Sequence, residues 1–106
     1  SGWVNVNGAP STWRAVVDET GEPIIACSGV PTGVMRTTEM YQNFIIELEW
    51  RHHVPGGNAG LFVWSDALPV RGVPFTRSVE VQVMDGLEGD GYTSDGDIFP
   101  IHGARM

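Results

Sequence analysis

Basic residues are scarce in this chain. Lys and Arg together number six, against 13 Asp and Glu, and the formal net charge is −7 over 106 residues. Binding to nucleic acid or to an anionic membrane surface depends on clustered Lys and Arg that displace counterions. The composition therefore argues against binding to nucleic acid or to an anionic membrane. Neutral molecules remain the natural ligands for this chain.

Cysteine is almost absent. Cys27 stands alone, so no intrachain disulfide can form and no cysteine-based metal site exists. The apolar and small residues around it, 24–28, predict a small core residue rather than a reactive thiol.

Long apolar runs are missing too. None approaches the length of a transmembrane helix, and no signal peptide begins at Ser1, so an exported protein would already have lost its leader. We expect a periplasmic or extracellular location of the bacterial type.

Helical periodicity is also lacking, apart from one short turn expected over residues 37–42. The chain has 14 Gly and 7 Pro, and turn formers such as Asn7-Gly8 and Thr20-Gly21 separate short strand-like segments. These segments are residues 3–6, 13–17, 24–28, 33–36, 44–51, 61–64, 79–84 and 98–102. The pattern predicts a single all-β domain over residues 1–106.

The segment 78–85 alternates with period two. Glu80 and Gln82 share one face, while Val79, Val81 and Val83 share the other, which is typical of a half-buried strand that presents a carboxylate.

The segment 44–51 repeats this alternation. Its apolar face is Phe44, Ile46, Leu48 and Trp50, and we expect the last three of these in the core. Its polar face is Glu47, Glu49 and Arg51. Both strands lack Lys and concentrate Glu, Gln and Arg, a composition found in sugar-binding clefts. The alternative is a solvated strip of ion pairs that contributes little to stability.

Together with residues 33–36, 41–44, 55–62 and 96–99, these two segments resemble the 3-keto-disaccharide hydrolase domain family over nearly the whole chain. The resemblance implies an antiparallel β-sandwich of the concanavalin-like or jelly-roll type. It also implies cleavage or elimination of glycosides oxidised to a ketone at sugar C3. Family domains typically begin one strand earlier and continue beyond Met106, so we expect the sandwich to be incomplete in this chain.

The implied chemistry needs a base. A ketone at C3 acidifies the proton on C2, so a carboxylate or a histidine can remove it, and the group on C1 then leaves by elimination. From strand-face geometry, Glu80 or Glu49 would be the base, and Arg51 or His102 would stabilise the enolate. Asn58 and Gln82 would recognise sugar hydroxyls, although Asn58 serves equally well as a turn residue.

Three further residues are candidates for substrate binding: Trp64, Glu47 and Asp85. Trp64 follows a strand, where an indole can stack on a pyranose, although burial is the ordinary fate of a tryptophan. The order Glu-x-Gln-x-x-Asp ending at Asp85 is similar to the Glu-x-Asp-x-x-Glu signature of retaining glucanases. Its central amide, and the bulge that Asp85 would need, argue against that mechanism.

Metal ligation has weak support. His52, His53 and His102 show no His-x-His or His-x-x-x-His spacing, and the acidic loop 85–97 does not follow the EF-hand order. We expect no cofactor and no metal, with a divalent cation as the minor alternative, and a solvated loop over 85–97.

Two other readings stay open. A non-catalytic carbohydrate-binding module could use the same fold and the same side chains, and a fragment could have neither activity. An incomplete sandwich would leave strand edges and aromatic residues uncovered, including Trp3, Trp13, Phe44 and Phe99. We therefore expect a saccharide ligand, and either a homo-oligomer or a complementary chain that completes the sandwich.

Overall fold

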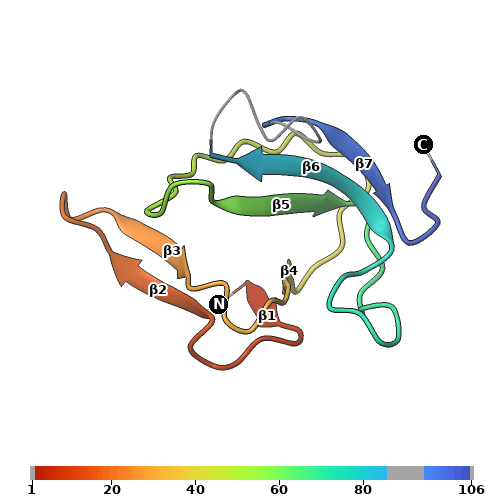
Figure 1. Cartoon of the computed structure of the whole chain (residues 1–106), viewed down its shortest axis with the longest axis horizontal. Coiled ribbons are helices and arrows are strands. Elements are labelled where there is room, and N and C mark those ends of the chain that lie inside the picture. Colours follow the sequence, from red (N-terminus) through yellow and green to blue (C-terminus); the bar gives the residue numbers. More distant parts are fainter. Residues whose placement is uncertain (1, 86–94, 106) are drawn as a thin grey trace. The chain divides into compact units, whose positions relative to one another are not determined.

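The computed structural model describes residues 2–85 and 95–105, and every strand pairing in this part of the chain is antiparallel (Figure 1). The described residues form seven strands and no helix. In order, the strands are β1 (Trp3–Asn5), β2 (Trp13–Val17), β3 (Pro23–Cys27), β4 (Met35–Thr37), β5 (Asn58–Val63), β6 (Ser78–Met84) and β7 (Ile98–Ile101). The all-β, antiparallel fold class is confirmed and is compatible with a β-sandwich. The helical turn expected over 37–42 is wrong, because Thr37 ends a strand and no helix follows it.

Contacts divide the chain into two compact units. The first comprises Ser1–Met40 and Ala67–Phe75, and it contains the pair β1–β4 and the hairpin β2–β3. Asp18 closes the hairpin: its Oδ1 accepts hydrogen bonds from the backbone N–H of Thr20 at 2.8 Å and of Glu22 at 3.0 Å. Gly21 supplies the left-handed conformation that the turn requires, with φ of 89°. The turn expected at Thr20-Gly21 is therefore confirmed.

Thr12 is a buried polar anchor of this first unit. Its hydroxyl accepts from the N–H of Ala9 at 2.9 Å and donates to the carbonyl oxygen of Val30 at 2.9 Å. The side chain is buried, so these two bonds satisfy a hydroxyl that would otherwise be costly to remove from water. The loop before β2 is thereby tied to the loop after β3.

The second unit comprises Tyr41–Asp66 and Thr76–Met106, and it holds the three-stranded sheet in the order β5–β6–β7 (Figure 1). β6 is the central strand. Val63 pairs with Val79 and Asn58 with Met84 along one edge, while Ser78 pairs with Ile101 along the other. Period-two Val residues and good β-formers explain why 78–84 forms the longest strand.

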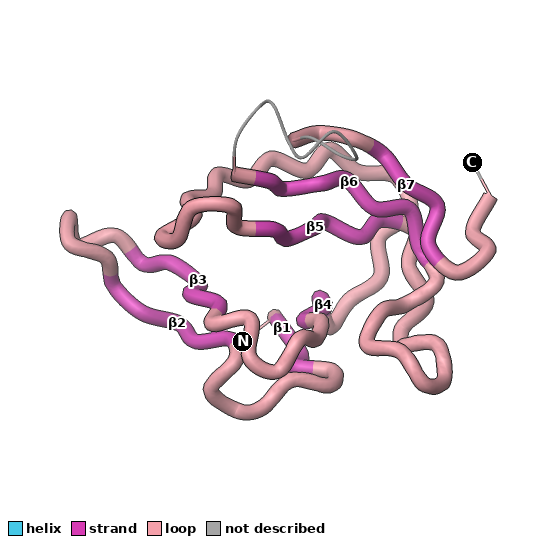
Figure 2. The backbone as a smooth tube through the Cα atoms, in the orientation of Figure 1, coloured by secondary structure: helices cyan, strands magenta, loops and turns pink. Residues whose placement is uncertain are grey.

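The segment 44–51, expected as a strand, forms none. The tube between β4 and β5 is drawn as loop throughout (Figure 2), and the side chains of residues 40–51 are exposed. The expectation that Ile46, Leu48 and Trp50 lie in the core is wrong, since Trp50 alone is 48% exposed. Alternation gives a segment an amphipathic face, but the backbone becomes a strand only when a neighbour takes up its hydrogen bonds, and no described strand does so.

The core is small. Val83 is the one hydrophobic residue fully buried among the described residues, at 7% exposure, while Val79 and Val81 are half-buried. Cys27, expected as a core residue, is exposed, and its strand β3 pairs only with β2 among the described strands. Ser78 and Gln82, on the polar face of β6, are buried like Val83, and more deeply than Val79 and Val81.

Candidate functional site

The polar face of β6 is the centre of the candidate site. Directly paired residues in an antiparallel sheet point to the same face. The register therefore sets Glu80 between Phe62 of β5 and Phe99 of β7, and it sets Gln82 across from Gly60. A carboxyl group flanked by two aromatic residues in mid-sheet is unusual for a solvated surface.

Glu80 is half-buried, and burial raises the pKa of its carboxyl above the ordinary value. Within the described part of the chain, no charged partner contributes to this shift. The residues across from Glu80 are both phenylalanines, and its same-face neighbours along β6 are Ser78 and Gln82, which do not titrate. A desolvated carboxylate without an ion-pair partner is a stronger base than a solvated one.

Gln82 is 8% exposed, and its Oε1 has no hydrogen-bond partner within the described part of the chain. A buried amide oxygen normally accepts a hydrogen bond. The backbone N–H of Gln82 donates to the carbonyl oxygen of Asp97 at 2.9 Å, which brings an acidic residue alongside. Glu80 and Gln82 thus form a polar pair set into a sheet face, as the alternation predicts.

Asp85 has a structural role here. β6 ends at Met84, and Asp85 Oδ2 accepts from the backbone N–H of Gly56 at 2.9 Å, while its own N–H donates to the carbonyl oxygen of Gly57 at 2.8 Å. These bonds fix the turn that leads into β5. Asn58 begins β5 across from Met84, and its side chain is exposed.

His52 supports the same turn. Its Nε2 lies 3.1 Å from the carbonyl oxygen of Val83, and its ring occupies the space where a side chain on Gly57 would lie. His53 is exposed. Only one of the two adjacent histidines packs against the sheet.

Glu47, Glu49 and Arg51 are exposed and lie in a segment without regular structure. The argument that set Glu49 on one face with Glu80 required a strand over 44–51, so it fails. His102 is exposed just after β7, in a left-handed conformation with φ of 52°. Of the residues nominated from the sequence, the structure brings together Glu80 and Gln82.

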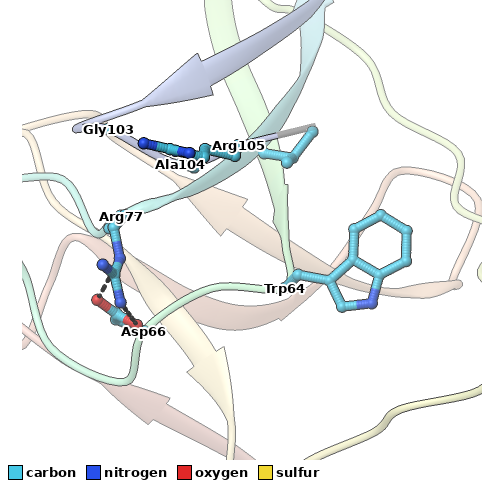
Figure 3. Close-up of a pocket in the computed structure, with 7 residues that line it drawn as sticks. Trp64, Asp66, Arg77, Gly103, Ala104 and Arg105 are labelled. Carbon is cyan, nitrogen blue, oxygen red and sulfur yellow. Dashed lines mark hydrogen bonds and ion pairs between the residues drawn. The ribbon is translucent and has the colours of Figure 1, made fainter.

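A separate hollow of about 390 Å³ lies at the end of the three-stranded sheet where β5 ends and β6 begins (Figure 3). Its lining residues are Trp64, Asp66, Arg77, Val79, Gly103, Ala104 and Arg105. Asp66 and Arg77 form an ion pair, with Oδ2 3.2 Å from Nε. Trp64 is 72% exposed with φ of 47°, and its indole points away from that pair and lies 6.1 Å from the ring of Phe44. The hollow is lined by the charged residues Asp66, Arg77 and Arg105 and by the exposed Trp64. The carboxyl group of Asp66 is exposed, so the lining contains no buried carboxyl group.

Within residues 2–85 and 95–105, no three His, Cys, Asp or Glu side chains gather in a way that could hold a metal ion. No helix in the described ranges is long and apolar enough to cross a membrane. Most of the acidic loop 85–97, namely residues 86–94, lies outside the described residues, so the expectation of a solvated loop stays a prediction there.

Three residues of the site were not found from the sequence: Gly60, Phe62 and Phe99. Gly60 and Phe62 share a face of β5, and their period-two spacing in the sequence predicts that shared face. Their place beside Glu80 depends on a pairing register between segments about 20 residues apart, which the local pattern does not encode.

A family model described as the 3-keto-alpha-glucoside-1,2-lyase-like domain matches residues 1–105. No curated protein and no solved structure matches the chain. The match spans the first unit, the β5–β6–β7 sheet and the polar face of β6. The chain belongs to the 3-keto-alpha-glucoside-1,2-lyase-like domain family.

Proposed function

We propose that this domain cleaves 3-keto-glycosides by base-catalysed elimination, with Glu80 as the base. Family membership supports the substrate class. The observation that carries the proposal is the half-buried carboxyl group of Glu80, whose pKa is raised by burial between Phe62 and Phe99.

The steps balance without a co-reactant. Glu80 takes the proton from C2, the electron pair of that C–H bond forms the C1=C2 bond by way of the C3 enolate, and the C1–O bond breaks. The aglycone oxygen takes up a proton, which the protonated Glu80 can return. The product is an unsaturated 3-keto sugar. Gln82 would bind the sugar in this scheme. Its buried Oε1 has no hydrogen-bond donor among the described residues, and a sugar hydroxyl could donate a hydrogen bond to it.

The test is release of nitrophenol from a nitrophenyl 3-keto-glucoside and from its unoxidised parent. We expect release from the ketone alone, since only the ketone acidifies C2. Glu80→Gln keeps the shape but removes the base, and it should lower kcat by about 10²–10⁴-fold. Glu22→Gln, an exposed position in the first unit, is the matched control and should retain turnover. Full turnover in Glu80→Gln would remove Glu80 from the mechanism.

The second candidate is a non-catalytic carbohydrate-binding module. The exposed Trp64 on the rim of the open hollow favours it, because exposed indoles stack on sugar rings in shallow sites. Binding of the unoxidised glucoside that is lost in Trp64→Ala, together with no turnover of the ketone, would support this candidate over the enzyme.

A further inference from the structure

Gly60 stands in the middle of β5 without a backbone reason for glycine. Six glycines of the described chain have a positive φ, namely Gly21, Gly29, Gly56, Gly72, Gly96 and Gly103, and Gly60 is not among them. Its backbone is that of an ordinary strand, which a residue with a side chain adopts readily. Glycine also weakens a strand interior, so the position calls for another explanation.

That explanation is the side chain of Glu80. A methyl group built on Gly60 would lie 2.8 Å from both Cγ and Cδ of Glu80, and closer still to Oε1. These separations are well below van der Waals contact. The Glu80 side chain therefore folds over Gly60, diagonally across the two strands, and its carboxyl group rests in the space that a Cβ would fill.

We propose that Gly60 is a positioning residue of the candidate site, whose missing side chain lets the Glu80 carboxyl group lie against β5 beside Phe62. The catalytic part of this inference rests on the proposed function of Glu80; the positioning itself does not. A residue with a Cβ at position 60 would push the carboxyl group away from the sheet and towards solvent. A displacement of about 1 Å in a catalytic group can cost up to about 100-fold in rate.

The fold itself should tolerate the change. The atoms in conflict belong to the far end of a flexible side chain, which can rotate away, and not to the backbone. Among the described strand residues, those paired with or next to Glu80 on its face are Gly60, Phe62 and Phe99 on the neighbouring strands and Ser78 and Gln82 on its own strand, and none of these five titrates. The acidic residue Asp97 lies beside Gln82, because its carbonyl oxygen accepts from the backbone N–H of Gln82. Loss of burial is then the main effect of the displacement on the carboxyl group.

The direct experiment is an NMR titration of the Glu80 carboxyl carbon in the wild type and in Gly60→Ala. The carboxyl group moves into solvent in the variant, so its pKa should fall towards the ordinary value. Turnover of the 3-keto-glucoside should fall roughly 10- to 100-fold in kcat with a smaller change in KM, and the acidic limb of the pH profile should shift down with the carboxyl pKa. Gly2→Ala is the matched control, because a methyl group there meets nothing within 4 Å.

A double-mutant cycle with Glu80→Ala isolates the contact. Alanine lacks Cγ, Cδ and Oε1, the three atoms that a Cβ at position 60 would meet, so Gly60→Ala should have little effect on the free energy of unfolding in a protein that already carries Glu80→Ala. If Gly60→Ala alone fails to fold, recovery of the fold in the double variant assigns the loss to the same contact, and loss in both overturns the proposal.

The two hypotheses fail separately. An unchanged Glu80 titration in Gly60→Ala overturns the positioning role. A shifted titration in a protein that never turns over the ketone supports the positioning role and rejects the proposed function.

Discussion

At the scale of single residues, Glu80 departs most from what its type and place would suggest. A glutamate in the middle of a strand usually reaches solvent, yet this one lies among Gly60, Phe62 and Phe99 and has its pKa raised by burial. A group held in this way is less stable in its charged form than it would be in the unfolded chain. The same environment that strengthens the base therefore lowers the stability of the folded domain at neutral pH.

The pH dependence of stability follows from this residue. The folded-state pKa is raised above the ordinary value of 4.5, so the stabilisation from protonated Glu80 is fully present below that pH. It is lost as the pH rises through the folded-state value. We expect Glu80→Gln, which cannot ionise, to unfold at a higher urea concentration than the wild type at pH 7 and to show a smaller advantage at pH 4.

Urea unfolding at both pH values measures this difference, with Glu22→Gln as the background. An advantage of Glu80→Gln that does not change between pH 4 and pH 7 would contradict the destabilising role of the buried carboxylate.

At the scale of elements, the strands with a nearby partner were predictable. The segment 13–17 forms β2 with the expected bounds, and its partner β3 follows across a short turn that Asp18 and Gly21 close. β6 was predictable from the alternation of Val with polar residues. The segment 44–51 shows equally clear alternation and forms no strand, because alternation says which side could be buried but not whether a neighbouring strand is there to pair with.

The buried face of β6 gives a stability test for this element. Val83→Ala removes two methyl groups from the fully buried apolar residue of the described chain, and we expect a loss of roughly 2 kcal/mol in the free energy of unfolding. Val17→Ala is the matched control, since that side chain is 66% exposed, and it should change stability by less than about 0.5 kcal/mol. Equal losses for the two variants, measured by urea denaturation, would contradict β6 as the centre of the core.

At the scale of the whole molecule, the sequence indicated the family, the all-β class and the carboxylate on β6, but only part of the candidate site. Glu80 and Gln82 are neighbours along one strand, so alternation alone relates them. Gly60 and Phe99 reach Glu80 through pairings with other strands, and Glu49 was assigned to the site through a strand that does not form. Local pattern thus predicts what one strand presents, whereas the rest of a site depends on long-range register.

The exposed apolar surface of residues 44–50 leads to a prediction about assembly. Phe44, Ile46, Leu48 and Trp50 are all exposed, and several large apolar side chains exposed within one short segment are usually covered in solution. We expect the purified chain to self-associate through this segment, with an apparent mass above 11.5 kDa in sedimentation and light scattering.

Ile46→Asp introduces a charge into this apolar segment and should shift the population towards the monomer, because burying an unpaired carboxylate is costly. Val17→Asp adds the same charge at an exposed position of the β2–β3 hairpin and should leave the association unchanged. A monodisperse 11.5 kDa species at working concentration would show that the exposed segment needs no partner.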